Sequence, residues 1–295
     1  MSKLINQVNI SSGYIHTPDG NIWVKIAGNH KTTAAVTLHG GPGFPHDYLE
    51  SLESLSNDRS IIFYDQLGCG RSDRPKDKNL WRCERFVSEL EILRSTLGIE
   101  QWHLFGSSWG TMLAMDYYLA FPQRVKSIVF KSPCLSAPQW AEDAKRLCLQ
   151  MGPEWNEDVQ KHEAAGTTDS VEYTEAKNQF MKNFVCRLPE IPISIQRSVV
   201  GKGNDPYEVM WGPSEFTATG NLKDYDRTKE LRQISVPTLF TCGRYDEATP
   251  ETVKSHAEMV KDSRFFIFEK SAHCAQAEEP ETFLSLIREF WAELD

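Results

Sequence analysis

Short apolar runs alternate with amphipathic stretches over much of the chain, and this alternation predicts strands connected by helices. Apolar runs typical of strands cover residues 7–15, 22–27, 33–38, 60–64, 102–105, 125–130, 236–242 and 264–268. Spacings of three and four residues, typical of helices that cover a sheet, occur over residues 84–97, 111–120, 251–260 and 279–291. We therefore expect an α/β fold with a mostly parallel, eight-stranded sheet flanked by helices on both faces.

The alternation breaks between residues 134 and 230, where the chain is polar, contains tryptophans and shows helical spacing without a clear buried strand. Strands and helices resume after this segment, and the sheet needs them for its completion. We therefore expect a helical cap of residues 134–230 inserted into a core of residues 1–133 and 231–295. A separate second domain is the alternative. Such a cap would cover the carboxyl ends of the strands, where ligands bind in open α/β folds.

The composition is that of a soluble globular protein, with 40% apolar and 25% charged residues among 295. A net charge of −9 argues against a nucleic-acid binder. The seven cysteines form no C-x-x-C pair, the start lacks the apolar core of a signal peptide, and no apolar run reaches the length of a membrane span. We expect a cytoplasmic protein with free thiols that binds neither nucleic acid nor membrane. The sequence leaves its oligomeric state open.

The strongest chemical signal is Gly106-Ser107-Ser108-Trp109-Gly110, which matches G-x-S-x-G between a predicted strand and a predicted helix. In that context the pattern predicts a nucleophile elbow, with Ser108 exposed on a strained turn above a helix N-terminus. The glycines on either side avoid a steric clash there. An ordinary glycine-rich turn is the alternative, so the serine needs support from other parts of the chain.

That support lies at three other predicted strand ends. The loop His39-Gly40-Gly41-Pro42-Gly43 can hold an oxyanion, and we assign its donors to the amides of Gly41 and Trp109. Asp246 is our choice for the acid that orients the base, with Glu247 as the rival. His273 follows the next strand and completes the order Ser, Asp, His as the proton acceptor. These residues need neither metal nor organic cofactor.

With these motifs, the chain resembles the proline iminopeptidases, serine aminopeptidases of the α/β-hydrolase fold, and is similar to tricorn-interacting aminopeptidase and L-amino acid amidases. The resemblance covers nearly the whole chain. It rests on the elbow, the His39–Gly43 loop and two further segments, Asp65-Gln66-Leu67-Gly68-Cys69-Gly70-Arg71-Ser72 and Gly243-Arg244-Tyr245-Asp246-Glu247.

The resemblance extends to residues 211–220, which are similar to a cap motif of that family. It implies that Glu215 and Glu247 bind the free amine of a small peptide or amino acid amide. Tyr207 lies in the same region and is a candidate to line the pocket, although cap aromatics are more often core. The implied activity is release of an N-terminal residue, with proline one candidate, through an acyl-enzyme. An esterase or amidase without strict amine recognition is the first alternative, and a non-catalytic ligand-binding protein is the second.

Overall fold

The computed structural model describes residues 10–29 and 31–295, and in this part of the chain eight strands form one sheet in the order β1-β2-β4-β3-β5-β6-β7-β8. β1 and β2 form an antiparallel hairpin, β2 pairs with β4 antiparallel, and the other neighbours are parallel. The strands are β1 (Ile10–Thr17), β2 (Gly20–Ala27), β3 (Ala35–Leu38), β4 (Ile61–Asp65), β5 (Trp102–Ser107), β6 (Val125–Lys131), β7 (Thr238–Gly243) and β8 (Ser263–Phe268). The predicted eight-stranded, mostly parallel sheet is confirmed, while residues 7–9 of the first predicted strand lie outside the described residues.

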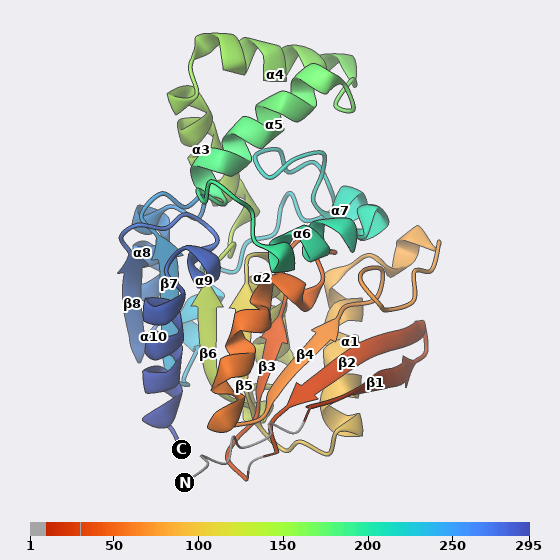
Figure 1. The fold of residues 1–295 in the computed structure, drawn as a ribbon, viewed down its shortest axis with the longest axis vertical. Helices are drawn as coiled ribbons and strands as arrows, with labels where there is room; N and C mark the ends of the chain where they lie inside the picture. The colour runs from red at the N-terminus through yellow and green to blue at the C-terminus, as the bar shows by residue number, and fades with distance from the viewer. Residues whose placement is uncertain (1–9, 30) are drawn as a thin grey trace, which may run out of the picture.

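Helices cover both faces of the sheet (Figure 1). Consecutive strand residues point in opposite directions, so apolar side chains on both faces need helices to bury them. Ile62 and Tyr64 of β4 belong to a cluster with α1 (Cys83–Thr96), α2 (Trp109–Ala120) and α8 (Pro250–Ala257). Ile61 and Phe63 belong to a second cluster with η1 (His46–Asn57) and α10 (Pro280–Ala292). The nearly unbroken apolar runs of the strands are therefore explained by burial on two faces.

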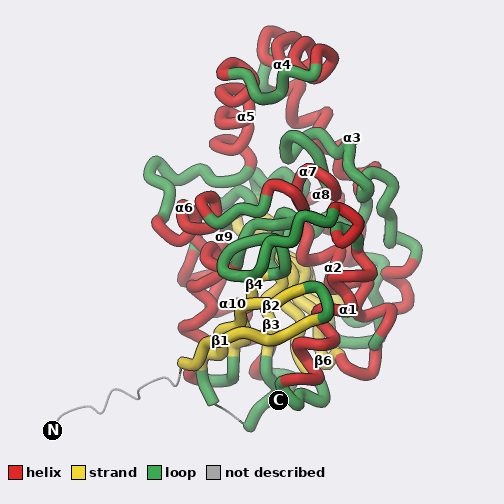
Figure 2. Tube along the Cα trace, turned by 90° about the vertical axis from the view of Figure 1, so that its right-hand side faces the viewer, coloured by secondary structure: helices red, strands yellow, loops and turns green. Residues whose placement is uncertain are grey.

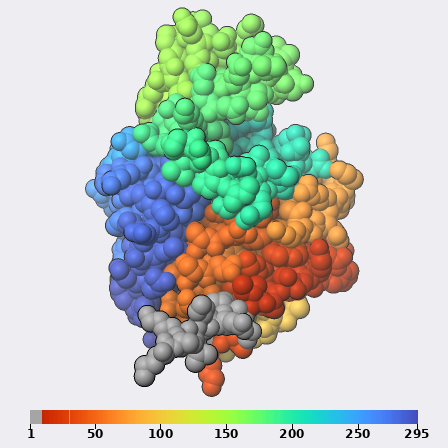
Figure 3. Space-filling view, in the orientation of Figure 1, coloured from red at the N-terminus to blue at the C-terminus, as the bar shows by residue number. Residues whose placement is uncertain are grey.

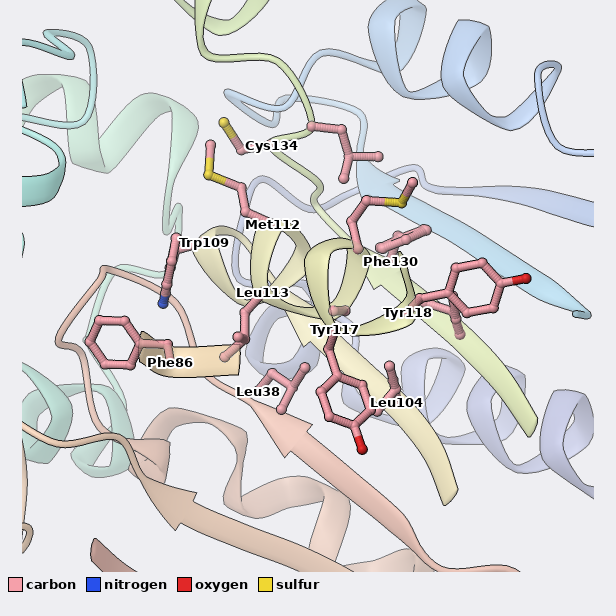
Figure 4. Packing of buried hydrophobic residues seen from close by; sticks show 14 of the residues in the cluster. Leu38, Phe86, Leu104, Trp109, Met112, Leu113, Tyr117, Tyr118, Phe130 and Cys134 are labelled. Carbon is pink, nitrogen blue, oxygen red and sulfur yellow. The ribbon is translucent and has the colours of Figure 1, made fainter. Parts of the chain in front are cut away.

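The first cluster is centred on α2, which follows the elbow (Figure 4). Met112 and Leu113 of this helix pack with Leu38 of β3, Leu104 of β5 and Phe130 of β6. Nine of the twelve residues of α2 are buried, so the helix cannot shift without disturbing the core. The strand before Ser108 and the helix after it are thus held firmly by packing.

Five α-helices lie between β6 and β7 in the chain. They are α3 (Ala137–Gln150), α4 (Pro153–Ala165), α5 (Val171–Phe184), α6 (Ile193–Val200) and α7 (Asn204–Met210). In Figure 1 they lie beyond the carboxyl ends of the parallel strands, and in the turned view of Figure 2 α4 and α5 project furthest from the sheet. The space-filling view shows these residues, yellow-green to teal, as one mass resting on the rest of the molecule (Figure 3).

The remaining elements are short connections around this framework. They are η2 (Lys78–Leu80), η3 (Pro122–Arg124), η4 (Glu230–Gln233) and α9 (Ala275–Glu278). The sequence pattern did not predict η1, whose residues occupy the connection between β3 and β4 as a run of 3₁₀ turns. Among the described residues, no helix is long and apolar enough to cross a membrane.

Candidate active site

The elbow has the strained geometry that the sequence predicts. β5 ends at Ser107, α2 begins at Trp109, and Ser108 between them has φ 55° and ψ −124°. A Cβ on Gly106 would lie 2.5 Å from the carbonyl oxygen of Gly110, and one on Gly110 would overlap the carbonyl oxygen of Leu38. Both flanking positions therefore require glycine, because the turn is packed against the chain on either side.

Asp246 and His273 form a buried hydrogen-bonded pair at the ends of β7 and β8. The Nδ1 of His273 lies 2.7 Å from Oδ1 of Asp246. The same carboxylate accepts hydrogen bonds from the hydroxyl of Ser132 at 2.6 Å and from the amides of Gly243 at 3.1 Å and Ala248 at 2.9 Å. Burial is the largest single influence and would raise the pKa of Asp246, but the charge and hydrogen bond of His273, together with Lys131 and Ser132, hold that pKa below its usual value. An ionised Asp246 fixes the ring of His273 with Nε2 free for another partner.

Ser108 and His273 line one cavity of about 570 Å³ between the sheet edge and the helices α5 and α6. The cavity wall also contains Glu215 and Glu247. The rest of the lining is largely apolar and comprises Gly40, Gly41, Phe44, Tyr48, Met181, Val185, Ile195, Ser198, Val199 and Cys274. The structure thus brings the candidate nucleophile, base and both candidate amine ligands to a single hollow.

Glu247 is a buried carboxyl group with an unusual environment. Its Oε2 has no hydrogen-bond partner among the described residues, and its Oε1 lies 3.6 Å from Nδ1 of His273. Burial, together with the nearby Glu215 and Asp246, raises the pKa of Glu247 well above its usual value. A buried acceptor without a donor is costly, so this carboxyl group is suited to a cationic ligand.

Tyr207 lies behind Glu215 and does not line the cavity directly. Its hydroxyl donates a hydrogen bond of 2.8 Å to Oε1 of Glu215. Burial and the Glu215 carboxylate raise the pKa of Tyr207 well above its usual value, so the hydroxyl remains a donor. The contact fixes one oxygen of Glu215. Tyr207 thus lies behind this glutamate, whereas the sequence suggested a place in the pocket wall.

The glycine-rich loop after β3 contacts the elbow closely. The amide of Gly40 already donates to the hydroxyl of Tyr48 at 2.7 Å, whereas Gly41 lines the cavity beside Ser108. Gly41 has φ 115°, and a Cβ there would overlap the nitrogen of Gly43. Only glycine therefore allows the chain to turn this tightly at position 41.

Gln66 connects three of the sequence motifs, a role that motif matching alone did not reveal. Its side-chain nitrogen donates to the carbonyl of His39 at 3.1 Å, and its side-chain oxygen accepts from the indole of Trp109 at 2.9 Å. Its backbone amide donates to Nε2 of His39 at 2.9 Å. Burial lowers the pKa of His39 to about 4, so this ring is neutral and accepts that bond. The sequence signal for Gln66 was its position directly after a predicted strand, within the Asp65–Ser72 motif.

Ser132 is the other site residue that the sequence did not suggest. It has φ 49° and follows β6, from which its hydroxyl reaches Asp246. No motif surrounds it, so only the pairing of β6 with β7 reveals its position.

One group of buried ligand-type residues, His46, Asp47 and Asp65, has atoms close enough to hold a metal ion. These carboxylates already have cationic partners, however. Arg197 lies 3.1 Å from Asp47, and Arg71 lies 3.3 Å from Asp47 and 3.6 Å from Asp65. The group is better explained as an ion-pair network that joins the β3–β4 connection to α6.

Fold and site together define a class of protein. A sequence profile for the α/β hydrolase fold matches residues 36–280. The proline iminopeptidase of Heyndrickxia coagulans is 46% identical over 95% of this chain and 98% of its own length. The solved structure of proline iminopeptidase from Mycobacterium smegmatis has a TM-score of 0.88 at 32% identity, over 96% of this chain and 98% of that one. The structure of VinJ has a TM-score of 0.92 at 35% identity, over 97% and 99%. This chain belongs to the proline iminopeptidase family of α/β hydrolases.

Proposed function

We propose that the protein is a serine aminopeptidase that releases an N-terminal residue, with proline the first candidate, from short peptides or amino acid amides. Ser108 attacks the carbonyl carbon, His273 takes the hydroxyl proton and Asp246 orients and stabilises the imidazolium. The amides of Gly41 and Trp109 stabilise the oxyanion. His273 then protonates the departing amine, and water hydrolyses the acyl-enzyme. The membership in the family, and relatives named proline iminopeptidases, support this reaction.

The observation that carries the substrate class is the pair of glutamates in the wall of the catalytic cavity. Glu215 and Glu247 lie in the same hollow as Ser108, and Glu247 keeps an unpaired oxygen in a buried position. An ammonium group would satisfy that oxygen and favour the ionised form of Glu247 beside Glu215. A substrate with a blocked N-terminus would leave this cost in place. The arrangement therefore favours substrates with a free amino end.

A smaller hollow adjoins the elbow, with free space for about one water molecule. Three indoles, those of Trp109, Trp140 and Trp211, line it together with Met112 and Cys134. The indole nitrogens of Trp140 and Trp211 are already hydrogen-bonded to carbonyls of Glu215 and Ser214. A compact side chain such as a pyrrolidine ring would contact apolar ring surface there once the indoles move apart to admit it.

The test compares hydrolysis of proline p-nitroanilide, alanine p-nitroanilide and N-acetylproline p-nitroanilide by the wild type and by Ser108→Ala. We expect fast cleavage of the free prolyl compound, slow cleavage of the acetylated one and none by the variant. Equal rates on free and acetylated compounds would make the protein an esterase or amidase with broad acyl specificity. Binding of the prolyl compound without turnover would instead make it a non-catalytic binding protein.

A further inference from the structure

The residues at the end of β6 lie directly beneath the candidate catalytic groups. Lys131 is 1% exposed and does not line the cavity. Its ammonium group donates a hydrogen bond to the backbone carbonyl of His273. Its own carbonyl accepts the backbone amide of Ser108 at 3.1 Å. One buried residue therefore contacts the backbone of both the candidate base and the candidate nucleophile.

The neighbouring residue, Ser132, contacts the candidate acid Asp246. The hydroxyl of Ser132 donates to Oδ2 of Asp246 at 2.6 Å, while its amide donates to the carbonyl of Thr241 at 2.7 Å. The second bond ties Ser132 to β7, the strand from which Asp246 follows. Two consecutive residues thus connect Ser108, Asp246 and His273.

Acidic groups near the buried side chain of Lys131 favour its charged form. Burial lowers the pKa of Lys131, and Cys274, Asp246, Glu278 and Glu247 limit that shift because they favour the ammonium form. These groups come from the β7–α8 connection, the loop after β8 and α9, so the ammonium group faces acids from several elements. An apolar side chain would fill the same space without the cost of burying a charge. The retained charge therefore needs an explanation beyond packing.

We propose that Lys131 and Ser132 are positioning residues for the reaction, which hold the backbone of His273 and the carboxylate of Asp246 in register with Ser108. Lys131 fixes the loop that contains the base, and its charge offsets the acids gathered beneath that loop. Ser132 fixes the second oxygen of Asp246, so that the first remains aimed at Nδ1 of His273. This inference rests on the proposed serine hydrolase chemistry and extends it to residues outside the cavity.

The primary test is Lys131→Met, with Lys126→Met as the matched control at the other, partly exposed end of the same strand. The first readout is the rate at which an alkyl fluorophosphonate labels Ser108, since this reaction needs the nucleophile and base but no amine recognition. We expect labelling by Lys131→Met to be slower by about tenfold or more, from loss of a charged hydrogen bond, and labelling by Lys126→Met to be unchanged. Labelling at the wild-type rate in a folded Lys131→Met would overturn the proposal.

The second readout is the pH dependence of kcat/KM on proline p-nitroanilide, which a purely structural role would not move. Removal of a cation near the Asp246–His273 pair makes protonation of that pair easier. The acid limb should therefore move to higher pH in Lys131→Met and stay in place in Lys126→Met. An acid limb that does not move in Lys131→Met would contradict the electrostatic part of the proposal.

Ser132→Ala keeps the test decisive if Lys131→Met fails to fold, because it removes only one hydroxyl. We expect about tenfold slower labelling with a melting temperature lowered by only a few degrees, because the amide of Gly243 still donates to the same oxygen of Asp246. Wild-type labelling by Ser132→Ala would refute the positioning role of the pair. A wild-type protein that is labelled at Ser108 but cleaves no free-amine compound would refute the proposed substrate class alone, since the labelling rates would still decide the role of Lys131 and Ser132. Absence of wild-type labelling would refute both proposals.

Discussion

Replacement of Glu247 by glutamine should make the protein more stable and less active at the same time. The carboxyl group is fully buried, has an oxygen without a partner, and lies near Glu215 and Asp246. Its pKa is therefore higher in the folded protein than in the unfolded chain. The folded state binds the extra proton, so stability falls as pH rises from the unfolded carboxyl's pKa, about 4.3, towards the raised value. Glutamine has no proton to lose and escapes this penalty.

The size of the stability effect follows from the one extra proton that the folded protein binds at Glu247. Each pH unit over which the folded carboxyl keeps its proton and the unfolded one does not costs about 1.4 kcal/mol. Between pH 5 and pH 7 the advantage of Glu247→Gln over the wild type should therefore grow by up to about 2.8 kcal/mol. Loss of a charge-assisted hydrogen bond to the substrate's ammonium group should lower kcat/KM on proline p-nitroanilide by about 10- to 150-fold.

Urea unfolding at pH 5, 6 and 7 measures the first effect, and initial rates on the p-nitroanilide measure the second. Glu258→Gln is the control, because Glu258 is an exposed glutamate at the end of α8 whose replacement should change neither quantity. A Glu247→Gln variant whose stability follows pH in parallel with the wild type would refute the argument from burial. Wild-type kcat/KM in the same variant would refute the role of Glu247 in amine binding.

Three further substitutions test the geometry of the site. Ser108→Gly should abolish hydrolysis while raising the free energy of unfolding by about 1 kcal/mol, because glycine tolerates φ 55° without strain; a loss of stability in urea would argue against a strained elbow. Gly110→Ala should cost about 3 kcal/mol or more, since its Cβ would overlap the carbonyl of Leu38, and a melting temperature equal to the wild type would contradict this packing. Tyr207→Phe should raise KM for proline p-nitroanilide about tenfold with little change in kcat, because Glu215 loses a donor while the carboxylate stays; steady-state kinetics would show an equal KM if the contact is unimportant.

Local sequence was sufficient for much of the fold. Apolar runs placed the eight strands within a few residues, because strands buried on two faces need continuous apolar side chains. The elbow was equally clear, since a strained turn between a strand and a helix requires glycine at Gly106 and Gly110 for steric reasons. The 3₁₀ turns of η1 were not predicted, because such short-range bonds leave no regular apolar spacing.

The contacts within the site depended on tertiary structure. The order of Ser108, Asp246 and His273 in the sequence suggested a triad, but only the pairing of β5, β6, β7 and β8 places the ends of these strands side by side. No local pattern marks Lys131 or Ser132, since their side chains bond to residues more than 100 positions away in the sequence. The environment of Glu247 likewise arises from burial against distant segments, and burial is what shifts its pKa. Sequence alone therefore determined the strands, the glycine-flanked turn and the candidate catalytic residues, because steric demands and apolar spacing act between neighbouring residues. Tertiary structure decided which residues contact these candidates and how burial shifts their pKa values, because long-range pairing and desolvation exist only in the folded chain.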